Sequence, residues 1–149
     1  MKNLLKVAFV LLFVNCNAQI IDLDDKGLYR HYPEGAYFKD INNFLDPFTG
    51  TFLYTNGNTS LKIVLLKRIN EFNGGYSEDV IYGGYEYKVN NITIVNTLPE
   101  NFPANTFSGR YYINGNLYIP NDYYPPCTTC APNEKRLFIS IRDTQCSYS

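Results

Sequence analysis

The feature that most constrains this chain is the pair Asn56-Gly57, which stands between two runs of alternating residues. An Asn-Gly pair favours a two-residue β-hairpin turn, because both turn positions must accept a positive φ. With these residues as the turn, Phe52 lies opposite Leu61 and Leu53 lies opposite Ser60. Side chains alternate along a strand, so the face of Phe52 is apolar and the face of Leu53 is half polar. The sequence therefore predicts that an antiparallel sheet starts here.

Two further pairs of turn residues predict further hairpins. The run Asp79–Val89 has the pattern of a strand, and Asn90-Asn91 would join it to a partner strand that begins at Ile92. The glycines Gly83-Gly84 inside the first of these strands predict a bulge or a sharp bend. Asn114-Gly115, between the runs RYYI and NLYI, predicts the turn of a third hairpin.

A short helix is predicted ahead of the first hairpin. Ile41, Phe44 and Leu45 follow the i, i+3, i+4 spacing of one helix face. Asp40 stands at the N-cap position, and Pro47 ends the pattern. With a last strand over 135–142, we predict an all-β fold: an antiparallel meander of hairpins that forms a barrel or half-barrel, with a short N-terminal helix. Closing such a barrel takes about eight strands and about seven are predicted, so we also expect the sequence to stop short of its natural end.

Residues 1–18 have the pattern of a secretory signal peptide. Lys2 and Lys6 give a positive start, Val7–Val14 is a short apolar run, and cleavage is expected after Ala18. The apolar run is too short for a bilayer, so we predict no transmembrane span. Cys16 leaves a second kind of processing open, because it stands where a bacterial lipoprotein signal places its lipidated cysteine.

The mature chain is predicted to be a tether followed by one domain. Residues 19–36 show no sustained periodicity and are interpreted as an N-terminal tether, and 37–149 as a single β-rich domain. An apolar content of 45% and a charged content of 18% are typical of a globular protein. A net charge of −1 and a pI near 5.8 give no electrostatic footprint for nucleic acid, so nucleic-acid binding is disfavoured and we expect no nucleic-acid partner. We expect an exported protein that is periplasmic, outer-membrane-associated or secreted.

Cys127 and Cys130, spaced as CTTC, are the most pointed motif, and Cys146 follows them. Export implies an oxidising compartment, so a structural disulfide is the default prediction. Either a cysteine of the motif bridges to Cys146, or the motif closes on itself. A redox site is disfavoured because prolines flank the motif and leave no helix to lower a thiol pKa. A zinc site would also need His31, which nothing places nearby, so we expect no metal and no cofactor.

A resemblance to a known family covers most of the mature chain. The stretch Tyr37–Lys67, YFKDINNFLDPFTGTFLYTNGNTSLKIVLLK, resembles the signature of a family of small exported bacterial proteins known only as a domain of unknown function. The resemblance continues through Ile81–Leu98 and the Cys-Pro-rich loop before KRLFISI, and members of that family continue beyond such a last strand. It implies no assigned activity. Gly50-Thr51-Phe52 after a short helix is also similar to the start of lipocalins, which implies a lipocalin-like barrel or half-barrel.

No set of charged residues forms a recognisable catalytic motif in the sequence. Glu78, Asp79 and Glu86 lie in or beside the central strands, where we expect each to face solvent. We therefore expect a non-enzymatic protein. The first hypothesis is a binding module for a small apolar ligand, lined by four aromatic side chains: Phe52, Tyr85, Tyr87 and Tyr112.

The alternative hypothesis is an envelope-tethered structural or protein-interaction lipoprotein that contacts an envelope protein through its tyrosine-rich face. The two hypotheses differ in what they require of the aromatic residues. An internal cavity lined by them would favour ligand binding, whereas a filled core with an exposed tyrosine patch would favour a partner surface.

Overall fold

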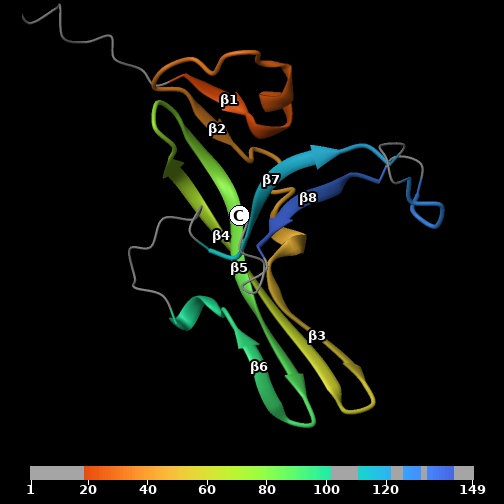
Figure 1. The fold of residues 1–149 in the computed structure, drawn as a ribbon. Helices are drawn as coiled ribbons and strands as arrows, with labels where there is room; N and C mark the ends of the chain where they lie inside the picture. Colours follow the sequence, from red (N-terminus) through yellow and green to blue (C-terminus); the bar gives the residue numbers. More distant parts are fainter. Residues whose placement is uncertain (1–18, 102–110, 122–125, 132–133, 143–149) are drawn as a thin grey trace, which may run out of the picture.

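The computed structural model describes residues 19–101, 111–121, 126–131 and 134–142. These residues form one eight-stranded sheet with three short 3₁₀ helices (Figure 1). The predicted β-rich fold is confirmed. The sheet is open over the described residues, since β3 pairs with β4 alone and β8 pairs with β7 alone.

The elements follow one another along the chain with short connections in the first two thirds. The 3₁₀ helices are η1 (Leu23–Leu28), η2 (Asp46–Phe48) and η3 (Pro99–Asn101). The strands are β1 (Ile20–Asp22), β2 (Tyr37–Lys39), β3 (Gly50–Asn56), β4 (Thr59–Phe72), β5 (Ser77–Val89), β6 (Ile92–Asn96), β7 (Ile113–Ile119) and β8 (Arg136–Ile141).

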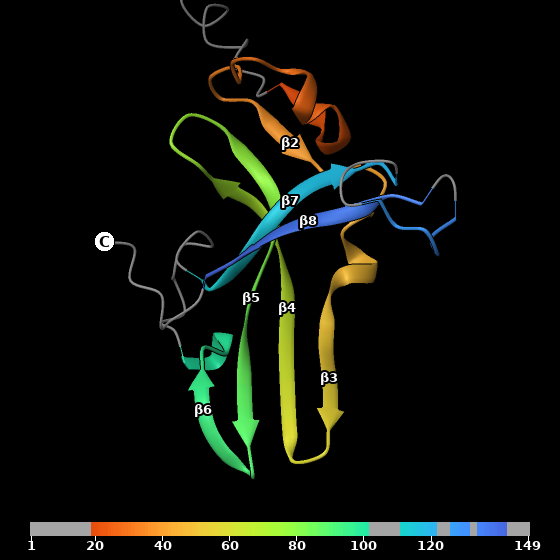
Figure 2. The same ribbon diagram turned by 45° about the vertical axis from the view of Figure 1, so that its right-hand side comes forward.

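Strand β5 organises the sheet. One of its edges pairs with β4 along most of its length, and its other edge pairs in succession with β2, β7 and β6. The β7–β8 ribbon crosses the long β4–β5 pair near its middle (Figure 2). The predicted meander is correct for the antiparallel pairs β3–β4, β4–β5 and β5–β6. It is wrong for β1–β2 and β2–β5, which are parallel, and for β7, which pairs with β5 rather than β6.

The first hairpin forms with its turn one residue later than predicted. Gly57 and Asn58 are the turn residues, and Gly57 has a φ of 56°. Phe52 therefore lies opposite Ile63 instead of Leu61. A shift of two positions in the pairing keeps every side chain on its predicted face, because side chains alternate with a period of two.

The second hairpin is confirmed. Asn90 and Asn91 both have positive φ, 51° and 62°, as a two-residue hairpin turn of this kind requires. Val89 lies opposite Ile92, as predicted, and a bulge then places Tyr87 opposite Val95.

The third predicted hairpin is wrong, because β7 continues through Asn114 and Gly115 without reversing direction. A Cβ atom on Gly115 would lie 2.5 Å from the carbonyl oxygen of Phe138 on β8. The glycine thus permits two strands to approach closely, where the sequence pattern indicated a turn.

The glycines Gly83 and Gly84 also permit close approach of neighbouring backbone; of the predicted bulge or bend, the bulge is absent from the β4–β5 pairing there. They pair in register with Leu65 and Val64 of β4. A Cβ atom on Gly84 would lie 1.7 Å from the carbonyl oxygen of Thr97, where the chain after β6 crosses β5. The irregularity in the β4–β5 pairing lies further on, between Arg68 and Glu71.

Residues 19–36, predicted to be a tether, instead belong to the packed structure. Ile21, Leu23 and Ala36 are buried in the main core, and β1 pairs with β2. These three apolar residues show no periodicity in the sequence, which therefore gave no signal for their burial.

The predicted short helix before β3 is replaced by turns and the 3₁₀ helix η2. The Asp40 carboxylate does accept bonds from the backbone N–H groups of Phe44 and Leu45, at 2.8 and 2.9 Å. Pro47 lies inside η2 instead of ending a helix before it. The Asp40 side chain therefore does cap backbone N–H groups, as predicted for an N-cap. The capped segment, however, forms short turns and not an α-helix.

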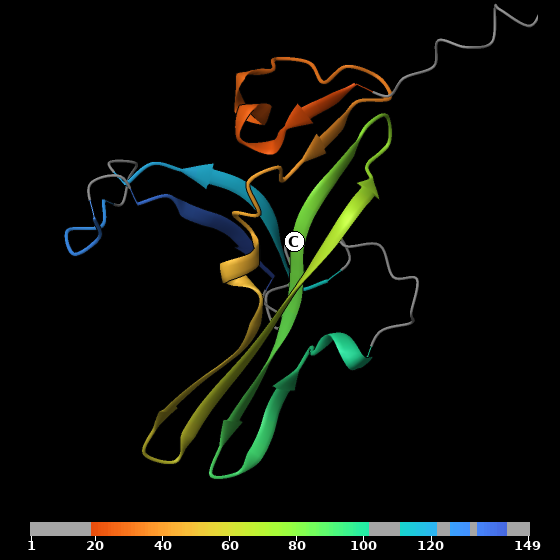
Figure 3. The same ribbon diagram turned by 180° about the vertical axis from the view of Figure 1, so that it is seen from behind.

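The core occupies the half of the molecule where β1, β2, η1 and β7 meet β4 and β5. Its most deeply buried apolar side chains are Phe38, Leu45, Ile81 and Ile113. The other half is formed by β3, β4, β5 and β6, which extend away from the core as a four-stranded ribbon (Figure 3). Among the described residues, no helix is long and apolar enough to cross a membrane.

Candidate functional site

The four-stranded ribbon has one predominantly apolar face. The pairing registers align alternate residues of its strands into rows, such as Phe52, Ile63 and Tyr85. We call this surface the apolar face; its members are Phe52, Tyr54, Leu61, Ile63, Tyr85, Tyr87, Val89, Ile92 and Val95.

The apolar face continues the core and emerges into solvent. Leu65, in the row next to the core, is 7% exposed. Phe52 in the next row is 46% exposed, and Tyr54 and Ile92 further along are 60% and 66% exposed. Large apolar surfaces left in contact with water commonly mark binding sites.

A hollow lies where the apolar face meets the ends of β7 and β8. It has a volume of about 150 Å³ and is lined by Leu61, Ile63, Tyr85, Ile113 and Ile141. An apolar cavity of about this size holds a single benzene ring, whereas drug-sized ligands need about 300 Å³ or more. The hollow therefore suits one ring or one branched aliphatic group.

The structure brings three of the four predicted ligand-binding residues to the same face. Phe52, Tyr85 and Tyr87 all belong to the apolar face, and Tyr85 also lines the hollow. Tyr112 precedes β7, where its carbonyl accepts a bond from the N–H of Arg142 at 2.7 Å, and it does not line the hollow.

Sequence reasoning missed the aliphatic part of the lining. Side-chain alternation along β4 puts Leu61 and Ile63 on the same face, that of Phe52, so the sequence does contain a signal for these two residues. Ile113 and Ile141 reach the hollow only because β7 pairs with β5 and β8 pairs with β7. No local pattern announces that long-range pairing.

The carboxylates of Glu78 and Asp79 are buried, which corrects the expectation that they face solvent. Asp79 accepts bonds from the Tyr37 hydroxyl at 2.6 Å and from the backbone N–H groups of Asp40 and Asn70, at 2.9 and 3.0 Å. It thereby ties β2, β4 and β5 together. Glu86 is partly buried and forms an ion pair with Lys88 at 2.7 Å.

Asp40 and Asp79 form a cluster of two buried carboxylates, which we call the Asp40 cluster. Besides its two backbone bonds, Asp40 accepts from Lys67 Nζ at 2.9 Å and from the Tyr118 hydroxyl at 3.0 Å. Burial alone would raise the pKa of Asp40, but the bonds from Leu45, Lys67, Phe44 and Tyr118 outweigh it and lower that pKa. A carboxylate held ionised by four donors is positioned for a structural role rather than for proton transfer.

The tyrosines that donate to these carboxylates are held in the neutral form. Burial raises the pKa of Tyr118 and of Tyr37, and the hydrogen bonds to Asp40 and Asp79 raise them further. The Tyr118 ring also packs against Phe44, with ring centroids 4.1 Å apart. The cluster therefore fixes β7 over the turn that precedes β3.

Glu78 forms a second polar network. It accepts from Lys26, from Asn116 at 2.6 Å and from Asn73 at 3.1 Å. Burial and the charge of Glu78 raise the pKa of Tyr76 to about 12. These contacts join η1, β5 and β7, so their role is also structural.

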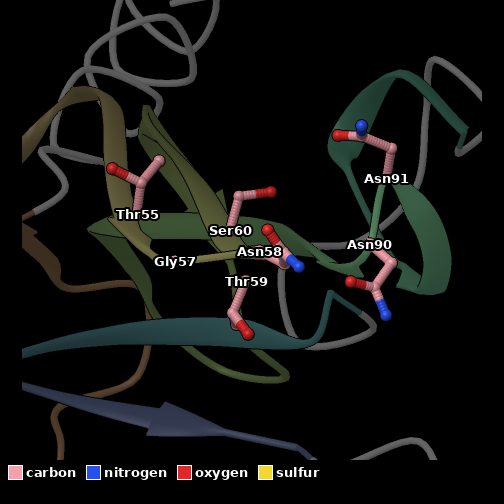
Figure 4. A pocket seen from close by; sticks show the side chains of 7 residues that line it. All are labelled: Thr55, Gly57, Asn58, Thr59, Ser60, Asn90 and Asn91. Atoms are coloured by element: carbon pink, nitrogen blue, oxygen red, sulfur yellow. The ribbon is translucent and has the colours of Figure 1, made fainter.

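A second, polar hollow of about 290 Å³ lies between the tips of the two hairpins (Figure 4). Its lining carries hydroxyl and amide groups and no charged side chain. The lining residues are Thr55, Gly57, Asn58, Thr59, Ser60, Asn90 and Asn91. Such groups can form hydrogen bonds with a neutral polar molecule. They include no acidic or basic side chain, and therefore no base that could activate a hydroxyl as a nucleophile.

The CTTC motif closes on itself, because Cys127 and Cys130 form a disulfide. Of the two pairings left open by the sequence, this one is present, while Cys146 and Cys16 lie outside the described residues. Sulfurs in a disulfide are not available as zinc ligands. Over the described ranges, no group of three or more His, Cys, Asp or Glu side chains is arranged to hold a metal ion.

A comparison with family models matches residues 1–149 to a family of unknown function, DUF6705. Neither the comparison with curated proteins nor that with solved structures found a match.

Proposed function

We propose a function from the geometry of the chain, which belongs to DUF6705, a family of unknown function. The proposed function is that of a non-enzymatic binding module for a small apolar ligand. The observation that carries this proposal is the hollow at the inner end of the apolar face. Its lining combines four aliphatic side chains with one aromatic ring, that of Tyr85.

The ligand that fits this geometry is a single ring or a branched aliphatic group. Burial of apolar surface supplies the affinity at about 25 cal/mol per Å² removed from water. The exposed aromatic residues beyond the hollow, such as Phe52 and Tyr54, extend the apolar surface for any further part of the ligand.

A second function is favoured by that exposed part of the face. Phe52, Tyr54 and Ile92 are each about half exposed or more, as expected of a surface that contacts a protein. In this alternative the chain is an envelope-tethered structural or interaction protein, and the hollow receives an apolar side chain of the partner.

Both functions are proposed for an exported protein. The pattern of residues 1–18 supports export, and the disulfide between Cys127 and Cys130 is of the kind that persists in oxidising compartments. The mass of the protein recovered from its natural compartment tests this. A chain beginning at Gln19 supports a soluble carrier, acyl groups on Cys16 support a tethered protein, and an unprocessed chain would contradict export.

Binding of toluene, measured by ligand-observed NMR, tests the ligand proposal. We expect saturable binding to the native protein and at least about tenfold weaker binding to Ile141→Lys, a loss of about 1.4 kcal/mol. Ile141 lines the hollow but is 59% exposed, so a lysine there is tolerated by the fold.

Ile69→Lys is the matched control. Ile69 is 69% exposed and lies on β4 outside the hollow. The Ile69→Lys variant should bind toluene as tightly as the native protein does. Equal binding by the native protein and both variants, or no saturable binding at all, would contradict the proposal.

A further inference from the structure

Strand β3 forms an open edge of the sheet. Within the part of the chain that the structure describes, β3 pairs with β4 and with no other strand. All seven of its residues, Gly50–Asn56, are exposed. Figure 2 shows it as the outermost strand of the four-stranded ribbon.

This edge lacks three of the devices that keep edge strands apart: charge, proline and a β-bulge. Its sequence, GTFLYTN, contains no charge and no proline, and its pairing with β4 has no bulge. Natural proteins usually protect such an edge, since its unpaired N–H and C=O groups accept another strand. An uncharged edge also presents no repulsion to an identical one.

The sequence of β3 is complementary to itself. An antiparallel pair of two β3 strands centred on Leu53 places Phe52 opposite Tyr54 and Thr51 opposite Thr55. Aromatic pairs and threonine pairs are both favourable across strands. Leu53 would lie opposite Leu53 of the second copy.

The alternating direction of the backbone hydrogen-bonding groups of β3 is also compatible with a strand pair centred on Leu53. A two-residue turn is flanked by a hydrogen-bonded pair, here Asn56 and Thr59, so alternate residues of β3 bond to β4. Thr51, Leu53 and Thr55 then direct their N–H and C=O groups outward. Centred on Leu53, two copies would form about six new backbone hydrogen bonds.

We propose that the protein forms a two-fold symmetric dimer by antiparallel pairing of β3 with β3 of a second copy. The two four-stranded ribbons then form one continuous sheet. Because residues opposite one another share a face, the two apolar faces join, and Phe52 lies beside Tyr54 of the partner subunit. The dimer does not depend on the proposed ligand.

Sedimentation equilibrium of the full chain over a range of concentrations is the first test. The native protein should approach twice its 17.1 kDa monomer mass. Leu53→Lys places two like charges opposite each other at the dyad and should leave a folded monomer. Leu53 is 69% exposed, as is Ile69, so Ile69→Lys is a control matched in exposure that should still dimerise.

Cysteine cross-linking tests the register. Leu53→Cys brings two sulfurs within disulfide range at the dyad, whereas Thr51→Cys keeps them about 13 Å apart. Oxidation should therefore give a covalent dimer with Leu53→Cys and not with Thr51→Cys, beyond that of the native chain. A monomeric native protein, dimerisation that survives Leu53→Lys, or equal cross-linking of the two cysteine variants would overturn the proposal.

Discussion

Removing the charge of Asp40 should destabilise the fold far more than removing the charge of Asp46, although both carboxylates contact the same lysine. Lys67 Nζ lies 2.9 Å from Asp40 and 2.6 Å from Asp46. The Asp40 side chain is 1% exposed and the Asp46 side chain is 56% exposed. An asparagine at either position keeps the shape and removes the charge.

The expected magnitudes follow from burial. Asp40→Asn replaces one acceptor oxygen by a donor and weakens bonds from Leu45, Phe44, Tyr118 and Lys67. Breaking a buried charge pair in this way costs about 3–5 kcal/mol. Losing the exposed Asp46 charge should cost about 1 kcal/mol or less.

Urea unfolding followed by circular dichroism measures both values. Asp40→Asn should lower the free energy of unfolding by about 3–5 kcal/mol, and the melting temperature by about 10 °C in a chain of this size. Equal losses for the two variants, or a loss below about 1 kcal/mol for Asp40→Asn, would refute the argument that the Asp40 cluster fixes β7 over the turn before β3.

Three further predictions concern other features of the fold. Since the folded-state pKa of Asp40 is lowered, its stabilisation is present above the unfolded-state pKa near 4 and is lost as the pH falls below it; the free energy of unfolding should decline there, less steeply in Asp40→Asn. Gly84→Ala should destabilise the protein by several kcal/mol in urea unfolding, because its Cβ would overlap the Thr97 carbonyl, whereas Gly27→Ala, with nothing within 4 Å, should change little. Replacing both Cys127 and Cys130 by serine should lower the free energy of unfolding by about 2 kcal/mol or less, because the closed loop is short, and a larger loss in thermal unfolding would show that the disulfide does more than close this loop.

The features that sequence reasoning predicted correctly depend on local chemistry. The turn at Asn90-Asn91 follows from two residues that accept positive φ, and the faces of β3 and β4 follow from alternation. The β-rich fold class could be predicted for the same reason. The four aromatic residues predicted to line a cavity, Phe52, Tyr85, Tyr87 and Tyr112, are not among these features, since only Tyr85 lines the hollow.

The features that it missed depend on long-range packing. Gly115 carries the same turn signal as Gly57, yet it lies within β7 because β8 passes within contact distance of its backbone. Asp79 looks like a surface residue until β2 and the irregularity of β4 at Asn70 supply its donors. Ile113 and Ile141 join the hollow only through the β5–β7–β8 pairing, which no short segment encodes.

The most direct test of ligand binding at the hollow is a toluene titration of methyl-labelled protein followed by NMR. The account predicts saturable shifts of the methyl signals of Leu61, Ile63, Ile113 and Ile141, which line the hollow. The methyl signals of Leu53 and Ile69, both exposed but outside the hollow, should remain unchanged. Shifts of similar size at all six residues, or none at the four lining residues, would contradict a binding site there.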